Sequence, residues 1–173
     1  FFHPDPTVKR QSGFLSPIFT DSTSIGTGFG LPYYWAISND KDLTFAPKIY
    51  RNENPLFLNE YRQAFKNGFL ILDTSYTEGY KKTNLNKTDG SRNHIFGKLN
   101  YNFSDDDSYL SQLSLQVQKT SNDTYFRIHD VNSALVDSSN TDLKNEISYS
   151  YEKDDIFFNF STSAYENLRK NSN

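Results

Sequence analysis

The stretch from Ile25 to Ile37, "IGTGFGLPYYWAI", decides the class of fold because apolar side chains recur at every second position. The odd positions are apolar or nearly so, whereas the even positions are mostly small or conformationally restricted residues. A repeat of two residues puts alternate side chains on opposite faces of a β-strand, whereas the pattern of an amphipathic helix repeats about every 3.6 residues. This stretch therefore predicts a strand with one apolar, aromatic face and one nearly bare face.

The same alternation recurs along the chain, at residues 95–103, 112–118, 146–151 and 156–163. A soluble β-sandwich also alternates, so the pattern by itself leaves two architectures open. Two features favour a membrane barrel. The segments run roughly 9 to 12 residues, the length of a tilted strand that crosses a bilayer, and short turns alternate with long loops. We therefore expect an all-β, antiparallel, up-and-down transmembrane β-barrel segment.

About nine strands of a larger barrel are predicted, because an odd number leaves an unpaired edge that has to continue into further strands. Short turns follow the even-numbered strands, and Asn67-Gly68 is the strongest hairpin signal among them. Long polar loops follow the fifth and seventh strands. The short turns are therefore assigned to the periplasmic side, next to an aromatic girdle that includes Tyr33, Tyr34 and Trp35. The predicted strands are 12–19, 24–37, 42–51, 56–66, 69–78, 92–103, 109–120, 143–151 and 156–165.

The composition argues against several classes of function. The 173 residues carry a formal net charge of -3 with scattered Lys and Arg, which does not suit a nucleic-acid binder. There is no Cys for a disulfide or a thiolate metal site, and no run approaches the roughly 18 apolar residues of a transmembrane helix. The sequence also lacks an initiating Met and a signal peptide, so we expect a fragment of a longer chain whose secretion signal lies upstream.

Two prolines interrupt the first two predicted strands, Pro17 in the first and Pro32 in the second. Proline cannot donate a ladder hydrogen bond, so it is normally confined to edge strands, strand starts and bulges. Taken alone, the two residues favour the interpretation that Pro17 protects an edge and that Pro32 lies at a bulge.

Four motifs carry a family resemblance: "VKRQSGFLSP", "GLPYYWAISNDKDLTFAP", "NEYRQAFKNG" and "QVQKTSNDTYFRIHD". In this order they closely resemble the outer-membrane lipopolysaccharide-assembly family LptD, also called the organic solvent tolerance family. The resemblance covers most of the chain and is densest between residues 3 and 68. It implies that residues 1–11 are a linker from a periplasmic β-jellyroll domain absent from this chain. It also implies that residues 12–173 are part of an outer-membrane β-barrel domain.

The resemblance implies a non-enzymatic role in lipopolysaccharide transport and assembly at the outer membrane of a Gram-negative bacterium. The implied partners are lipopolysaccharide, an LptE-like lipoprotein that plugs the barrel, a periplasmic LptA-like bridge joined through the jellyroll, and outer-membrane lipids; no cofactor is implied. The family's lateral gate lies between its first and last barrel strands, and the gate prolines match Pro17 and Pro32. The last strand and the family's disulfide cysteines lie outside this chain.

Five further residues near the first strands are candidates for contact with lipopolysaccharide. Gly26, Gly28 and Gly30 form the bare face of the second strand, where they either leave lumenal space for a bulky glycolipid or mark strand twist and flexibility. Lys9 and Arg10 lie at the joint where anionic phosphates would arrive. We expect this basic pair to make either an electrostatic contact or only a solvated linker.

Other polar residues are expected to be structural. Glu60 and Arg62 flank Tyr61, so they point to one face, where a lumenal charge pair is tolerated. The acidic turn 105–107 either binds Ca²⁺ or is simply solvated, and we favour the second. No Ser-His-Asp or paired-carboxylate arrangement stands out, which argues against a barrel enzyme, although distant residues can converge in a fold. The histidines lack metal-ligand spacing and are expected to be incidental: His3, His94 and His129.

Two alternatives to the transport role stay open. A small outer-membrane barrel with a structural or adhesive role would bind an external ligand through its long loops, and a signal peptide would directly precede Phe1. A soluble β-sandwich binding module would express as a monodisperse soluble protein.

Overall fold

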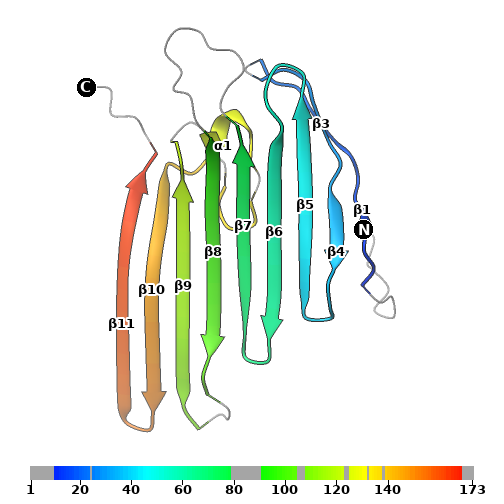
Figure 1. Cartoon of the computed structure of the whole chain (residues 1–173). Helices are drawn as coiled ribbons and strands as arrows, with labels where there is room; N and C mark the ends of the chain where they lie inside the picture. Colours follow the sequence, from blue (N-terminus) through cyan, green and yellow to red (C-terminus); the bar gives the residue numbers. More distant parts are fainter. Residues whose placement is uncertain are drawn as a thin grey trace, which may run out of the picture.

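The computed structural model describes residues 10–23, 25–78, 91–104, 108–122, 125–131, 133–137 and 139–168. All of its strands belong to one antiparallel sheet, in which successive strands from β4 to β11 lie side by side (Figure 1). The all-β, up-and-down architecture predicted from the sequence is confirmed. The strands are β1 (Gly13–Phe14), β2 (Ile18–Thr20), β3 (Gly28–Gly30), β4 (Tyr33–Ala36), β5 (Lys41–Tyr50), β6 (Leu56–Phe65), β7 (Gly68–Thr77), β8 (Arg92–Asn102), β9 (Leu110–Thr120), β10 (Asp142–Lys153) and β11 (Ile156–Asn167).

The long strands follow the sequence pattern, whereas the first two predicted strands do not stay continuous. Strands β5 to β11 match the third to ninth predicted strands to within two residues at either end. The first predicted strand is divided into β1 and β2 by residues 15–17, and the second is divided into β3 and β4 by residues 31–32. The prediction of two unbroken strands is therefore wrong, and both breaks contain a proline, which cannot donate to a ladder.

A glycine turn also shortens the second predicted strand. The amide of Gly26 donates to the carbonyl oxygen of Ser22 at 2.8 Å, and the φ of Gly26 is 79°. Glycine adopts positive φ without the steric cost that other residues carry. The strand therefore begins at Gly28, four residues later than the alternation predicts.

The Asn67-Gly68 hairpin turn lies one residue earlier than predicted. Phe65 pairs with Gly68, so the two turn residues are Lys66 and Asn67, and Gly68 is the first residue of β7. A Cβ atom on Gly68 would overlap the carbonyl oxygen of Asn100 on β8. The φ of Gly68 is not positive, so backbone conformation does not require glycine here. The close approach of two strands does.

The pleat gives the sheet two different faces. Residues paired across neighbouring strands share a face, and the pairs Asp42–Arg62 and Glu60–Asp73 place charged side chains on the same side. We call this side the polar face and the opposite side the apolar face. The polar face includes Lys48, Ser75, His94, Lys98, Gln116, Gln118, Glu146 and Ser163. The apolar face includes Phe14, Phe29, Tyr33, Trp35, Phe45, Phe57, Ile95, Val117, Ile147, Phe158 and Phe160.

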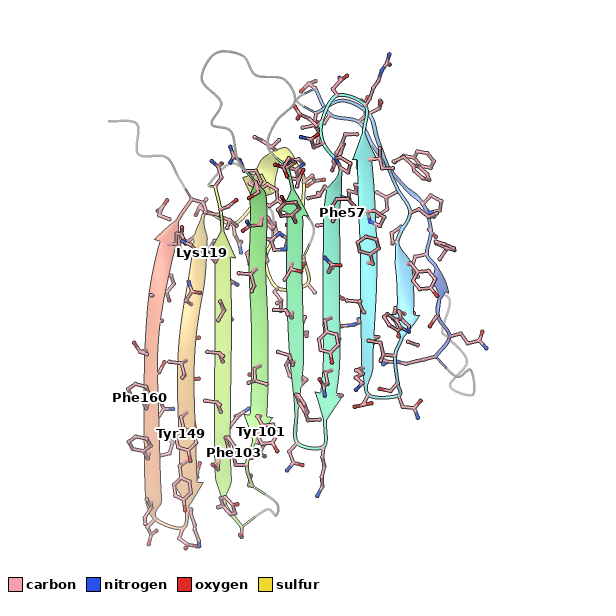
Figure 2. The ribbon with its side chains drawn as sticks, viewed as in Figure 1. Phe57, Tyr101, Phe103, Lys119, Tyr149 and Phe160 are labelled. Carbon is pink, nitrogen blue, oxygen red and sulfur yellow. The ribbon has the colours of Figure 1, made fainter. Side chains whose placement is uncertain are left out.

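Aromatic side chains gather on the apolar face toward the short turns, where Figure 2 labels Tyr101, Phe103, Tyr149 and Phe160. The rings of Tyr101 and Phe103 meet edge to face at 4.9 Å between centroids. Toward the opposite end of the same face, Lys119 forms an ion pair with Glu166 at 2.7 Å. Strand surfaces that meet a bilayer carry an apolar band flanked by aromatic girdles, and the aromatic cluster near the short turns matches one such girdle.

Tyr34 does not join this aromatic group. Tyr33 and Trp35 lie on the apolar face, opposite Phe45 and Leu43. The hydroxyl of Tyr34 instead donates to Asp42 on the polar face at 3.3 Å. The expectation that all three aromatics form one girdle is corrected for Tyr34, because adjacent residues of a strand point to opposite faces.

The sequence predicts a long polar loop between β9 and β10, and the described part of this loop folds back over the polar face. It contains α1 (Tyr125–Ile128), which lies at one end of the sheet near β8 (Figure 1). Tyr125, Phe126, Val131 and Val136 of this loop are buried and form the main apolar core together with Phe96 and other sheet residues. No helix among the described residues is long and apolar enough to cross a membrane.

Candidate functional site

Pro17 and Pro32 lie at the breaks in the first two strands, where the pairing changes register. Three residues of the first strand, 15–17, span the same interval as two residues of the second, 31–32. One extra residue on one strand of an antiparallel pair is a β-bulge, which bends the strand and disrupts the ladder. The pairs that flank the breaks are Phe14–Tyr33 and Ile18–Gly30.

The bulge leaves few backbone hydrogen bonds between these strands. The amide of Leu15 donates to the carbonyl oxygen of Pro32 at 2.9 Å. Pro32 has no N–H to donate in return, so this antiparallel pair makes one bond where two are usual. Two short ladders therefore remain, with two residue pairs between β1 and β4 and three between β2 and β3.

A third proline, Pro47, weakens the next strand pair at the same level. The register of β3 and β4 against β5 is continuous, so Leu31 lies opposite Pro47. The amide of Arg51 donates to Thr27 on the second strand at 2.9 Å. Along a strand, the amides of every second residue point to the same neighbouring strand. An N–H at position 47 would therefore point to the second strand, as that of Arg51 does, and would meet Leu31; Pro47 has no such N–H.

We call Pro17, Pro32 and Pro47 the proline row, because they lie at neighbouring positions of three successive strands. Sequence reasoning identified the first two prolines and missed the third. The available signal was a proline in the interior of the predicted strand 42–51, a position that a central strand normally excludes.

The three glycines of the second strand lie close to the proline row and are closely packed. A Cβ atom on Gly28 would overlap the ring of Tyr50, and a Cβ on Gly30 would lie 3.2 Å from Cγ of Lys48. A Cβ on Gly26 would meet the side chain of Asn52 at 2.7 Å. Of the two alternatives, open space beside the glycines therefore does not hold at Gly28, where the ring of Tyr50 fills the position.

Arg10 contacts a carboxylate of the sheet. Its guanidinium lies 3.1 Å from Asp42, which is almost fully buried, and the guanidinium of Arg62 reaches the other oxygen of the same carboxylate at 2.8 Å. Arg62 is 3.6 Å from Glu60, so the predicted charge pair on one face is present. Two arginines thus share one buried carboxylate near the short turns, and Lys9 lies outside the described residues.

A buried chain of polar side chains links β7, β8 and the inward loop. His94 Nε2 lies 3.1 Å from Asp73, and His94 Nδ1 lies 2.5 Å from the hydroxyl of Ser75. That hydroxyl also bonds to the phenol of Tyr125 in α1. Ser75 and His94 are cross-strand partners, so a Ser-His-Asp arrangement that no sequence motif indicated is brought together by strand register. Its serine is 4% exposed and attaches the loop to the sheet.

The sequence comparisons identify the family. A family model described as LptD protein matches residues 1–173. This chain belongs to the LptD family. The chain is 30% identical to the LPS-assembly protein LptD of Nitrosomonas europaea over 122 residues, which is 65% of this chain and 17% of the relative.

Other LptD relatives match along more of the chain. The LPS-assembly protein LptD of Legionella pneumophila is 29% identical over 85% of this chain and 19% of its own length. That of Nitrosococcus oceani is 27% identical over 83% of this chain and 18% of its own length. The chain therefore spans less than a fifth of the length of these LptD relatives.

In this LptD-family chain, His129 is held inside the apolar packing of the loop. Its ring lies 5.1 Å from the ring of Tyr125 and 5.8 Å from that of Tyr50, measured between centroids. Burial, and to a lesser extent the positive charge of Lys48, lowers the pKa of His129 to about 4. His129 is therefore neutral near pH 7, because the charged form would lose its hydration.

The remaining predicted positions of the LptD-family chain are the other histidines and the acidic turn. His3 and the acidic turn 105–107 lie outside the described residues. Within the residues that the structure describes, no group of three His, Asp or Glu side chains is arranged to hold a metal ion. His94, expected to be incidental, instead lies in the buried chain with Asp73 and Ser75.

Proposed function

We propose that this chain forms the first part of the wall of an outer-membrane barrel that delivers lipopolysaccharide to the outer leaflet. The wall would part near the proline row. The observation that carries this proposal is the loss of backbone pairing at Pro17, Pro32 and Pro47 in three successive strands. Membership of the LptD family supports the substrate.

The two faces of the sheet suit the two parts of a lipopolysaccharide molecule. The apolar face would meet membrane hydrocarbon and outer-membrane lipids, while the polar face would line the lumen. Acyl chains would stay in hydrocarbon as the sugars pass along the polar face. A molecule that occupies both environments at once can leave a closed barrel only if the wall opens sideways.

The strand pairs of the sheet differ in the number of backbone bonds that hold them together. Strand β6 pairs with β7 along all ten of its residues. The first two strands share only two short ladders, and each ladder bond contributes about 1 kcal/mol net. Because parting strands must break the bonds between them, the first strand pairs open at a lower free-energy cost than the rest of the sheet.

The wider assembly follows from family membership and is part of the same proposal. Residues 1–11 would link the barrel to a periplasmic jellyroll, through which an LptA-like bridge supplies lipopolysaccharide. An LptE-like lipoprotein would plug the completed barrel. The ion pair between Arg10 and Asp42 attaches the first described residue to β5. It therefore supports a linker that leaves the sheet at the end with the short turns.

The test is to restore backbone donors in the full-length protein. Replacing Pro17→Val together with Pro32→Thr would return up to two ladder bonds, about 2 kcal/mol, and make opening about thirtyfold rarer. We expect less surface lipopolysaccharide and greater sensitivity to detergents. Pro55→Ala is the matched control, because Pro55 lies between β5 and β6, outside both strands.

The proposal is contradicted if the double variant, present at the normal level in the outer membrane, keeps normal surface lipopolysaccharide and detergent resistance. An adhesive barrel would predict this result, because its function would not require the wall to open. The inward packing of Phe126 and Val131 gives that alternative no support, since these loop residues are buried against the sheet.

A further inference from the structure

A cavity of about 440 Å³ lies on the polar face directly beside the proline row. Pro32, Leu15 and Ile18 form its wall on the side of the first two strands. Lys48 on β5 lines it as well, and Asp130 contributes from the inward loop. The cavity therefore joins an apolar wall at the break in the ladder to charged groups further along the polar face.

Lys48 is an unusual member of this lining, because only 6% of its surface is exposed. Within the described part of the chain its ammonium makes no hydrogen bond and has no carboxylate within ion-pair distance. Among the described residues, the ammonium nitrogen is not one of the buried polar atoms that lack a partner, so it is open to the cavity although the rest of the side chain is covered. An anion that entered the cavity would supply the missing partner.

Asp130 is the acidic residue whose charge acts on Lys48 across the cavity. It is exposed, it lies just after α1, and its φ of 44° is uncommon for a residue other than glycine. The loop thus holds a carboxylate near Lys48 without forming a contact ion pair. This arrangement partly offsets the charge of the ammonium while leaving its donors available.

The other carboxylates of the cavity already have partners. Glu60 lies 3.6 Å from Arg62, and Asp73 lies 3.1 Å from His94. Both come from β6 and β7, on the side away from the first strands. They are therefore not available to pair with Lys48, which is the cationic side chain among the residues that line the cavity.

We propose that this cavity binds an anionic group of the sugar region of lipopolysaccharide, either a phosphate or a sugar carboxylate, through Lys48. Leu15 and Ile18 would contact the apolar part next to that group, and Asp130 would act as the counter-charge that the ligand replaces. The inference rests on the proposed transport function and adds a binding residue to it. The cavity would hold the substrate next to the break in the ladder before the wall opens.

The test uses full-length protein with its lipoprotein partner in detergent, titrated with purified lipopolysaccharide. Lys48→Gln is expected to weaken binding about tenfold, whereas Lys48→Arg, which keeps the charge, is expected to bind within about threefold of wild type. Lys98→Gln is the matched control, because Lys98 lies on the polar face of β8 and does not line the cavity. Asp130→Asn is expected to tighten binding, because it removes the competing carboxylate.

Dephosphorylated lipopolysaccharide distinguishes the two sources of the anion. If the effect of Lys48→Gln disappears with this ligand, the anion is a phosphate; if the effect persists, the anion is a sugar carboxylate. The inference is overturned if Lys48→Gln binds no more weakly than Lys98→Gln, or if Asp130→Asn weakens binding. Failure of the wild-type protein to bind lipopolysaccharide would instead refute the proposed function itself. A shift in gel mobility on heating checks that each variant contains a folded barrel.

Discussion

Replacing Phe126→Ala should release the inward loop from the polar face without unfolding the sheet. Phe126 is 1% exposed, and its ring meets that of Phe96 edge to face at 5.5 Å between centroids. Truncating a buried phenylalanine costs about 3 to 5 kcal/mol. We expect the lower end of this range, because water can enter the space that the ring leaves at the loop.

This energy is lost from docking of the loop, because the aromatic partners of Phe126 are Phe96 and His94 on β8. A loss of about 3 kcal/mol lowers the docking equilibrium constant roughly a hundredfold. Amide protection inside the loop should fall by a similar factor. The amides of His129 and Val131 report it directly, since they donate to Tyr125 and Phe126 at 3.2 and 3.1 Å.

Hydrogen exchange of the full-length protein, read by mass spectrometry of short peptides, measures this change. Peptides from the inward loop should exchange faster, whereas peptides from β6 and β7 should keep their protection. Phe160→Ala is the control, because Phe160 lies on the apolar face and is half exposed. Unchanged exchange in the loop would refute the argument, and so would an equal loss of protection throughout the sheet.

Two further predictions concern pH and packing. Because the pKa of His129 is about 4 in the docked loop and about 6.5 when it is free, docking should be strongest above pH 6.5 and weaken as the pH falls toward 4. The loss is on the order of 3 kcal/mol, and a spin label at Ser133 should become mobile over this range in wild type but not in His129→Gln. Gly68→Ala should destabilise the sheet by about 1 to 3 kcal/mol in urea unfolding, since its Cβ overlaps the Asn100 carbonyl. Gly97→Ala should be nearly neutral, because its Cβ would have ordinary contacts, and equal unfolding midpoints would contradict the packing argument.

The long strands were predictable because their signal is local. From β5 onward, alternation of side chains fixes both the strand and its two faces, and the structure agrees to within two residues. The breaks in the first two strands were not predictable in the same way. A proline shows that one hydrogen-bond donor is missing, but it does not show in which register the two strands pair after the break. The register change between Phe14–Tyr33 and Ile18–Gly30 depends on both strands together.

The inward loop and its polar contacts could not be derived from the sequence. Phe126, Val131 and Val136 are spaced five residues apart, which is neither a helical nor a strand repeat, so their common burial depends on the sheet beneath them. Ser75 and His94 are nineteen positions apart and meet only through the register of β7 with β8. Lys48 looked like one more polar residue of an alternating strand, although it is nine-tenths buried.

The proline row has a consequence for the height of an opening. It divides the contact between the first two strands into ladders of two and three residue pairs, so either part can separate while the other stays paired. In the barrel that we propose, a slit could therefore form over only part of the membrane thickness. Such a partial slit would favour release into a single leaflet and leave the permeability barrier of the other leaflet intact.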